Sequence, residues 1–177
     1  MGHLEHKKDI KAGKLLDVYV ITLSDTRKES EDESGSYIKE KLLSASHKVS
    51  GYSIIKDDKE LLENIIVKIC YPDQKHKTDA LIINGGTGVS FKDITYETLK
   101  NLYDKELYGF GELFRSLSYN EIGSSAIMSR ASAGIYNGKI IFSVPGSLNA
   151  VKLAMDKIIL NEIGHIYYEI SKHLSII

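Results

Sequence analysis

The chain has 177 residues, of which 42% are hydrophobic, so it is long and apolar enough to build the core of one ordinary domain. Its formal net charge of −1 gives no whole-molecule attraction to nucleic acid or to an anionic membrane, and its single cysteine, Cys70, excludes an internal disulfide. No apolar run approaches the roughly 18 residues of a membrane span. We therefore expect a soluble protein that binds neither nucleic acid nor membranes.

The N-terminal segment MGHLEHKKDIKAG is polar and lacks the apolar centre of a secretory signal. We expect residues 1–13 to be a mobile tail and the protein to be cytoplasmic. Residues 14–177 contain neither an internal repeat nor a linker-like segment, which favours a single domain.

The first half of this domain predicts a strand, a helix and a second strand. Residues 15–24 form a nearly continuous apolar run with β-branched side chains, which is typical of a strand covered on both faces. A charged loop follows, and Ser34 stands where it can cap a helix whose apolar positions have helical spacing. Residues 48–56 predict the second strand, and Asp57-Asp58 opens a further helix.

A third strand over residues 79–86 ends in a glycine-rich loop. Thr95 is the expected N-cap of the helix that follows this loop. Another helix is expected within residues 111–122, where an apolar pattern of helical period resumes.

The last third of the chain predicts a hairpin and two helices. Asn137-Gly138 stands between two apolar runs, which favours a type I′ turn. Residues 149–159 and 162–174 are expected to form two closing helices. Alternating strands and helices predict a three-layer αβα sandwich with a mostly parallel central sheet, to which the C-terminal β-hairpin is added.

The glycine loop after the third strand is the first candidate site. Gly85, Gly86, Thr87 and Gly88 follow a strand end and precede a helix, where ligands bind in open α/β sheets. Backbone N–H groups of such a loop can approach a phosphate closely. A tight turn without a ligand is the structural alternative. The loop matches neither the Walker A pattern nor the G-x-G-x-x-G dinucleotide pattern.

A second loop of small residues, Pro145-Gly146-Ser147, ends the last strand and also precedes a helix. Two such loops on one edge of a sheet predict one extended polyanionic ligand. Pro145 as a simple turn former is the alternative.

Three acids follow strand ends in the same way: Asp25, Asp57 and Asp93. Acids beside a phosphate loop repel the ligand unless a cation lies between them, and Mg²⁺ prefers carboxylate and phosphate oxygens. Helix capping by each acid is the structural alternative. No metalloprotease, serine-hydrolase or cysteine-nucleophile pattern is present.

Four segments carry a resemblance to a known family: EDESGSYIKEKL, NGGTGVSFKDITYETL, GFGELFRSLSYNEIGSSAIMSRASAG and FSVPGSLNAV. The chain resembles the MoaB/Mog family of molybdenum cofactor biosynthesis, nearer to the MoaB branch, over roughly residues 15–160. The resemblance implies a three-layer αβα fold that binds molybdopterin. It also implies a homotrimer or a homohexamer, and a downstream metal-insertion enzyme as a partner.

Active members of this family use Mg²⁺ and ATP to adenylylate the phosphate of molybdopterin and release pyrophosphate. The resemblance implies catalytic and metal-binding roles for Asp57 and Asp93. This chain has Lys92 where the family often has arginine, which keeps the charge but loses the two-pronged guanidinium.

The remaining site residues are expected to bind molybdopterin or nucleotide. They are Ser24, Asp25, Gly85, Gly86, Thr87, Gly88, Glu112, Pro145, Gly146 and Ser147. The first hypothesis is a molybdopterin adenylyltransferase. The second is a non-catalytic molybdopterin carrier, and a nucleotide-hydrolysing regulator is the weakest because a Walker motif is missing.

Overall fold

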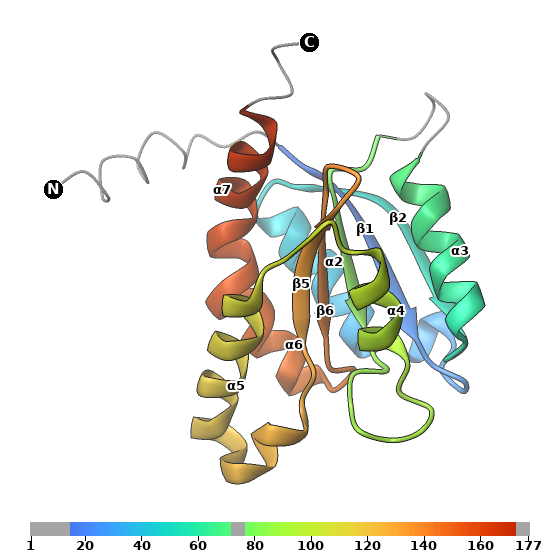
Figure 1. Cartoon of the computed structure of the whole chain (residues 1–177), viewed down its shortest axis with the longest axis vertical. Coiled ribbons are helices and arrows are strands. Elements are labelled where there is room, and N and C mark those ends of the chain that lie inside the picture. The colour runs from blue at the N-terminus through green and yellow to red at the C-terminus, as the bar shows by residue number, and fades with distance from the viewer. Residues whose placement is uncertain (1–14, 72–76, 173–177) are drawn as a thin grey trace, which may run out of the picture.

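The computed structural model of the protein describes residues 15–71 and 77–172. Six strands form one sheet in the order β2-β1-β3-β6-β5-β4 (Figure 1). The strands are β1 Asp17–Leu23, β2 Lys48–Ile55, β3 Ala80–Asn84, β4 Lys105–Glu106, β5 Ser132–Tyr136 and β6 Lys139–Val144.

Four neighbouring strands, β2, β1, β3 and β6, run parallel, and β5 and β4 add an antiparallel edge. The predicted hairpin is confirmed, because β5 pairs antiparallel with β6 around Asn137 and Gly138. Both turn residues have positive φ, 46° and 69°, as a type I′ turn requires. The two-residue strand β4 was not predicted from the sequence.

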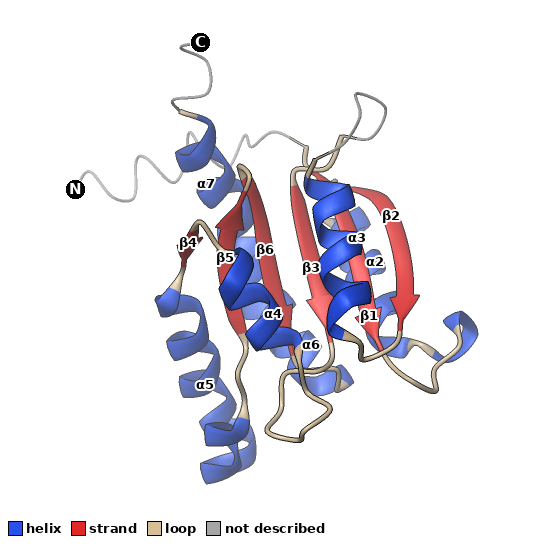
Figure 2. Ribbon diagram, turned by 45° about the vertical axis from the view of Figure 1, so that its right-hand side comes forward, coloured by secondary structure: helices blue, strands red, loops and turns tan. Residues whose placement is uncertain are grey.

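Helices cover both faces of the sheet, which confirms the predicted three-layer αβα sandwich (Figure 2). The helices are α2 Glu33–Ser44, α3 Lys59–Cys70, α4 Thr95–Leu102, α5 Tyr108–Ile122, α6 Leu148–Ala154 and α7 Leu160–Ser171. Helices α3 and α4 contribute to one apolar core, whereas α2, α5, α6 and α7 contribute to the other.

Strand β3 shows why the central strands are apolar throughout. Its five residues are all buried; Ala80 and Ile82 belong to one core and Leu81 and Ile83 to the other. Alternate side chains of a strand face opposite sides of a sheet, so both faces of β3 need apolar residues. Cys70 is buried in the core beneath α3, and burial raises the pKa of its thiol to about 12, so this cysteine packs as a small apolar residue.

Two predicted helix caps are wrong, and the side chains of both residues make other hydrogen bonds. Asp32, not Ser34, caps α2, because its carboxylate accepts a hydrogen bond from the N–H of Gly35 at 3.0 Å. Thr95 is the first residue of α4 and follows the N-cap position, which Ile94 occupies. The hydroxyls of Ser34 and Thr95 instead donate to backbone carbonyls of the two loops at the sheet edge. The predicted cap at the start of α3 is present, since Asp58 accepts from the N–H of Leu61 at 2.9 Å.

The two closing helices form one continuous helical run. A π-helical turn over Met155–Ile159 joins α6 directly to α7, so the predicted break between them is absent. Helix α5 begins at Tyr108, earlier than predicted. Most apolar residues of α7 pack on the core, with Ile163 fully inside it.

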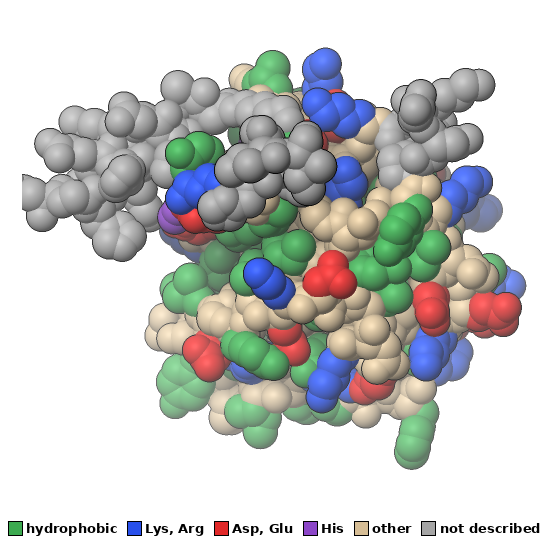
Figure 3. Space-filling model, turned by 45° about the horizontal axis from the view of Figure 1, so that its top comes forward, with side chains coloured by type: hydrophobic (Ala, Val, Ile, Leu, Met, Phe, Trp, Pro, Cys, Tyr) green, Lys and Arg blue, Asp and Glu red, His purple; other side chains and the backbone are tan. Residues whose placement is uncertain are grey.

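Within residues 15–71 and 77–172, no helix combines the length and the hydrophobicity that crossing a bilayer requires. The face shown in Figure 3 carries acidic and basic side chains interspersed with apolar ones. The expected tail over residues 1–13 and the end of the last predicted helix lie outside the described residues.

Candidate functional site

The carboxyl ends of the four parallel strands bring most of the predicted site residues together. Ser24 and Asp25 follow β1, and Asp57 follows β2. The glycine loop, Gly85 to Gly88, follows β3, and the second loop, Pro145 to Ser147, follows β6. The two loops touch, because the N–H of Gly85 donates to the carbonyl of Val144 at 3.0 Å.

Every carbonyl of the glycine loop accepts a hydrogen bond from outside the loop. Thr95 donates its hydroxyl to Gly85 O at 2.9 Å and its N–H to Gly86 O at 3.0 Å. Arg130 donates its N–H to Thr87 O at 2.9 Å and its Nε–H to Gly88 O at 2.6 Å. Two residues, from α4 and from the segment before β5, therefore fix the orientation of four successive peptides.

The N–H groups of Gly86, Thr87 and Gly88 have no acceptor among the residues that the structure describes. Buried or half-buried backbone N–H groups are nearly always paired, so three unpaired donors in a row need an external acceptor. Gly85 and Gly86 have φ of 108° and 63°, which other residues adopt only with strain. The glycine loop thus has the geometry of an anion-binding cradle.

Arg130 extends this support to the acid that follows the loop. One Nη of its guanidinium donates to the carbonyl of Asp93 at 2.9 Å, and the other pairs with the carboxylate of Glu97 on α4. Arg130 was not singled out from the sequence as a site residue. It lies in the quoted segment MSRASAG, but spacing along the chain contains no signal that pairs it with a loop more than 40 residues away.

The three acids gather beside the cradle. The carboxylate of Asp57 lies against Gly86, where an added Cβ would come within 3.1 Å of Oδ1, and that of Asp93 lies against Gly88. Burial raises the pKa of Asp57, and the nearby charges of Asp25 and Asp93 raise it further. The charges of the other two acids thus disfavour the ionised form of Asp57.

Lys92 neutralises one of these acids. Its Nζ lies 3.0 Å from the carboxylate of Asp25, and this contact lowers the pKa of Asp25 and raises that of Lys92. Asp93 accepts a hydrogen bond from the N–H of Ser90 at 2.8 Å, which holds it at the mouth of the loop.

The carboxylates of the site could bind a hard cation such as Mg²⁺ only if a bound ligand supplied further oxygen atoms. No three carboxylate, imidazole or thiol groups of residues 15–71 and 77–172 converge closely enough to hold a metal by themselves. Mg²⁺ commonly takes one or two carboxylates and completes its shell with water and phosphate oxygens. Asp57 and Asp93 match that pattern beside a phosphate cradle.

The second loop is held by two other donors. Arg27 and Ser34 both donate to the carbonyl of Gly146, at 3.2 and 3.0 Å. The hydroxyl of Ser147 accepts from the N–H of Ala150 at 3.4 Å and so caps α6. An added Cβ on Gly146 would lie 3.2 Å from the Cα of Gly85, so this loop forms the wall behind the glycine loop.

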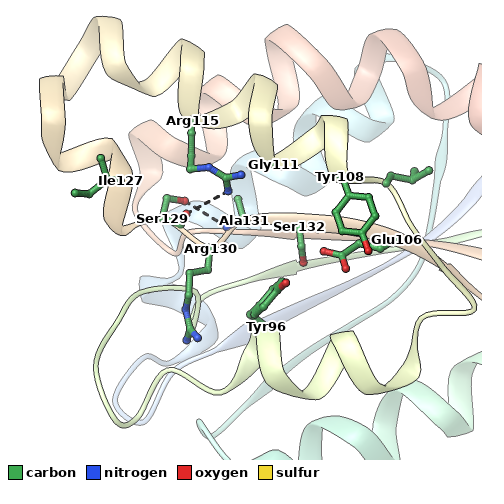
Figure 4. A pocket seen from close by; sticks show the side chains of 11 residues that line it. Tyr96, Glu106, Tyr108, Gly111, Arg115, Ile127, Ser129, Arg130, Ala131 and Ser132 are labelled. Carbon is green, nitrogen blue, oxygen red and sulfur yellow. Dashed lines mark hydrogen bonds between the residues drawn. The ribbon is translucent and has the colours of Figure 1, made fainter.

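Two pockets lie beside the acids and Arg130 at this edge of the sheet, in addition to one of about 280 Å³ at Ser147, between α5 and α6. The first, of about 340 Å³, lies between α4 and α5, and its lining includes Arg130 and Arg115 (Figure 4). The other, of about 500 Å³, is lined by Ser24 and Asp25, the cations Arg27, Lys28 and Lys56, and part of β2. Glu112 is exposed on α5 and does not line either pocket, so the structure does not bring it to the other predicted site residues.

Comparison with known proteins places this geometry in a family. Residues 19–165 match the family described as "Probable molybdopterin binding domain". The chain is 47% identical to the molybdenum cofactor biosynthesis protein B of Bacillus cereus over 173 residues, which cover 97% of this chain and 99% of the relative.

Solved structures agree with this match. A crystal structure of a molybdenum cofactor biosynthesis protein B has a TM-score of 0.86 at 46% identity and covers 90% of this chain and 98% of its own. The tungsten cofactor synthesizing protein MoaB from Pyrococcus furiosus has a TM-score of 0.76 at 41% identity, with 88% and 97% covered. The chain therefore belongs to the MoaB/Mog family of molybdopterin-binding domains.

Proposed function

We propose that the protein acts in molybdenum cofactor biosynthesis by transferring the adenylyl group of ATP to the phosphate of molybdopterin. One observation carries the proposal: three N–H groups of the glycine loop, without an acceptor among the described residues, stand beside the carboxylates of Asp25, Asp57 and Asp93, and Lys92 pairs with the first of these. Such a site suits two phosphate groups and a divalent cation between them.

In this reaction a phosphate oxygen of molybdopterin attacks the α-phosphorus of ATP. The new P–O bond forms as the bond to the β-phosphate oxygen breaks, and pyrophosphate leaves with the electron pair. The nucleophile is already anionic near neutral pH, so no general base is required. This agrees with a site that has no histidine among the residues lining its two pockets.

The chain contributes position and charge. The N–H groups of the glycine loop orient one phosphate, and the capture of their carbonyls by Thr95 and Arg130 keeps them aimed at it. Lys92, which pairs with Asp25, and Arg27, which lines the same pocket as Asp25, offset charge as pyrophosphate departs. Asp57 and Asp93 would hold Mg²⁺, which supplies charge neutralisation between the two reacting phosphates.

The two pockets beside the acids and Arg130 support a reaction with two substrates. An ion pair and a hydrogen bond connect them in series. Asp25 of the larger pocket pairs with Lys92, which precedes Asp93, and Arg130 of the smaller pocket donates to the carbonyl of Asp93. The reacting phosphates would meet between the pockets, at the glycine loop.

The test is to mix the purified protein with molybdopterin, Mg²⁺ and α-labelled ATP and to look for adenylylated pterin. We expect product that requires both Mg²⁺ and pterin and that is lost in Asp93→Asn with the fold intact. Wild-type turnover by Asp93→Asn would remove the metal role.

A non-catalytic molybdopterin carrier is the second candidate, because no three protein groups among the described residues converge on a metal position. Saturable pterin binding by a folded protein without any labelled product would favour the carrier.

We further propose that the protein assembles as a homotrimer or homohexamer. Large apolar side chains are exposed along α5 and the turn after it, including Tyr119, Ile122 and Ile127, which are 61%, 58% and 78% exposed. Large apolar side chains gathered on one exposed element often contact another protein. Sedimentation equilibrium checks the state, and a monomer would contradict the proposal.

A further inference from the structure

The smaller pocket, between α4 and α5, has walls and a floor from different parts of the chain. Tyr96 lies on α4, Tyr108 and Arg115 lie on α5, and the segment from Ser129 to Ser132 runs between the two helices (Figure 4). Its volume of about 340 Å³ falls within the range of roughly 300–1,000 Å³ that small-molecule sites occupy.

A carboxylate without a partner stands at one end of this pocket. Glu106 lines the pocket, is only partly exposed, and has no hydrogen bond or ion pair within the described part of the chain. Strand pairing places it opposite Gly134, so Glu106 and Ser132 share one face of the sheet. Ser132 is 4% exposed and its hydroxyl pairs with the Tyr103 hydroxyl at 3.1 Å. Figure 4 shows Glu106, Tyr108 and Ser132 at the same end of the pocket.

The other walls are flat. The Tyr96 ring stands between the two helices, and the guanidinium carbon of Arg130 lies 5.8 Å from the centre of that ring. Arg115 donates to the carbonyl of Ser129 at 3.4 Å, so its guanidinium also lies along the pocket. Aromatic rings and guanidinium groups stack on planar, unsaturated ligands.

Arg130 connects the pocket to the phosphate cradle. Arg130 lines the pocket and, through its N–H and Nε–H, also holds the carbonyls of Thr87 and Gly88. A planar ring a few bonds from a phosphate would therefore enter this pocket while its phosphate reached the free N–H groups of the glycine loop.

We propose that this pocket takes the pterin ring and that Glu106 recognises its 2-amino-4-oxo edge, a proposal that rests on the proposed function. That edge presents two adjacent donors, the 2-amino group and the ring N3–H, and a carboxylate accepts both at once. Adenine presents a donor beside an acceptor, N6–H₂ beside N1, so a carboxylate can satisfy only one of them. Glu106 thus assigns the pterin, and not the adenine, to the pocket between α4 and α5.

The test measures binding without ATP or Mg²⁺. Fluorescent 6-hydroxymethylpterin and 6-hydroxymethyllumazine are titrated against the full-length protein; the lumazine has a carbonyl in place of the 2-amino group and so faces Glu106 with an acceptor. We expect the wild type to bind the pterin about tenfold or more tightly than the lumazine. Equal affinities would overturn the proposal, and this comparison needs no variant.

Glu106→Gln is the matched substitution, because an amide offers one acceptor and one donor group. We expect it to lose most of the preference for pterin over lumazine while its circular dichroism stays that of the wild type. Glu63→Gln, which changes an exposed acid on α3, should keep the full preference. An unchanged preference in Glu106→Gln would overturn the proposal.

The two proposals fail separately. Adenylylation without any preference for pterin over lumazine would leave the proposed reaction standing and remove the role of Glu106. A Glu106-dependent preference without any adenylylated product would leave the pterin pocket standing in a carrier protein.

Discussion

The two loops at the carboxyl edge of the sheet are held by the same kinds of donor, but different numbers of their carbonyls are held. In both, an arginine and a hydroxyl from elsewhere in the chain donate to loop carbonyls: Arg130 and Thr95 for the glycine loop, Arg27 and Ser34 for the loop at Gly146. The first pair fixes four successive carbonyls, whereas the second pair converges on one.

This difference separates a binding surface from its support. In the glycine loop, every carbonyl is held by a hydrogen bond from outside the loop, so the N–H groups are left in a row for a ligand. In the loop at Gly146 only one carbonyl is held in this way, which does not orient a row of N–H groups. The loop at Gly146 packs against the glycine loop, because a Cβ added to Gly146 would lie 3.2 Å from the Cα of Gly85, and the hydroxyl of Ser147 caps α6. Substitutions in the first loop should therefore affect binding, and those in the second should mainly affect stability.

The largest effect is expected from Gly86→Ala. The added Cβ would stand 2.4 Å from the Thr95 hydroxyl oxygen, and the backbone would keep a positive φ of 63°. We expect turnover to fall about 100-fold or more, as when donors to a reacting phosphate are displaced, with a stability loss of about 1–3 kcal/mol.

Gly164→Ala is the control for that change. Gly164 lies in α7 with nothing within 4 Å of an added Cβ, so alanine should stabilise the helix by about 0.5–1 kcal/mol. Thermal unfolding and labelled-ATP turnover measure both variants. Near-normal turnover by Gly86→Ala would contradict the cradle.

Asp57→Asn should separate activity from stability. Its raised pKa means that the carboxylate is more costly to ionise in the folded chain than in the unfolded chain. Since the folded pKa lies above the unfolded value of about 3.9, ionisation of Asp57 lowers stability as pH rises through that window. We expect the variant to lose roughly 100-fold in turnover and yet to melt at a higher temperature than the wild type at pH 7.

The pH dependence provides the check. Below about pH 3 Asp57 is protonated in both states, so the melting difference between Asp57→Asn and the wild type should vanish. Asp58→Asn is the matched control, because asparagine caps helices as well as aspartate does and Asp58 caps α3. A variant at Asp57 that melts lower than the wild type at pH 7 would contradict the charge repulsion in the site.

Arg130→Lys and Arg27→Lys compare the two loops directly. Lysine at position 130 cannot reproduce donors to Gly88 O, Asp93 O and Glu97 at once, so we expect turnover to fall about tenfold or more. Lysine at position 27 loses one of two donors to Gly146 O, and the Ser34 hydroxyl remains. Its effect on turnover should be several times smaller. Equal losses of turnover in the two variants would show that both loops contribute equally to binding.

The smallest effect is expected from Ser147→Ala. The hydroxyl caps the short helix α6 through one long hydrogen bond of 3.4 Å, so its removal should cost about 0.5–1 kcal/mol of stability and leave turnover nearly unchanged. Chemical denaturation measures the loss. A large loss of turnover would move Ser147 from support to binding.

The sequence predicted the parts of the fold that depend on local pattern. Continuous apolar runs identified the buried parallel strands, and Asn137-Gly138 identified the hairpin, because each signal lies within a few adjacent residues. The same logic placed the glycine loop and the acids at one sheet edge, since the carboxyl ends of parallel strands meet there.

What the sequence did not predict depends on contacts between distant residues. The Ser34 and Thr95 hydroxyls were assigned to caps of their own helices, but each donates to a loop carbonyl outside its helix, 112 residues away for Ser34 and 10 residues away for Thr95. The support from Arg130 and the free carboxylate of Glu106 were missed for the same reason. Glu112 was carried over by resemblance, and its position on the exposed side of α5 follows from helix packing that spacing alone does not reveal.

We propose that the N–H groups of Gly86, Thr87 and Gly88 bind phosphate beside Asp57 and Asp93. The most direct measurement is an NMR titration of the ¹⁵N-labelled protein with inorganic pyrophosphate, with and without Mg²⁺. We predict the largest amide shifts at these three residues, enhanced by Mg²⁺ in the wild type and not in Asp57→Asn. Glycine-loop amide signals that do not shift at saturating pyrophosphate and Mg²⁺ would show that this loop does not bind phosphate.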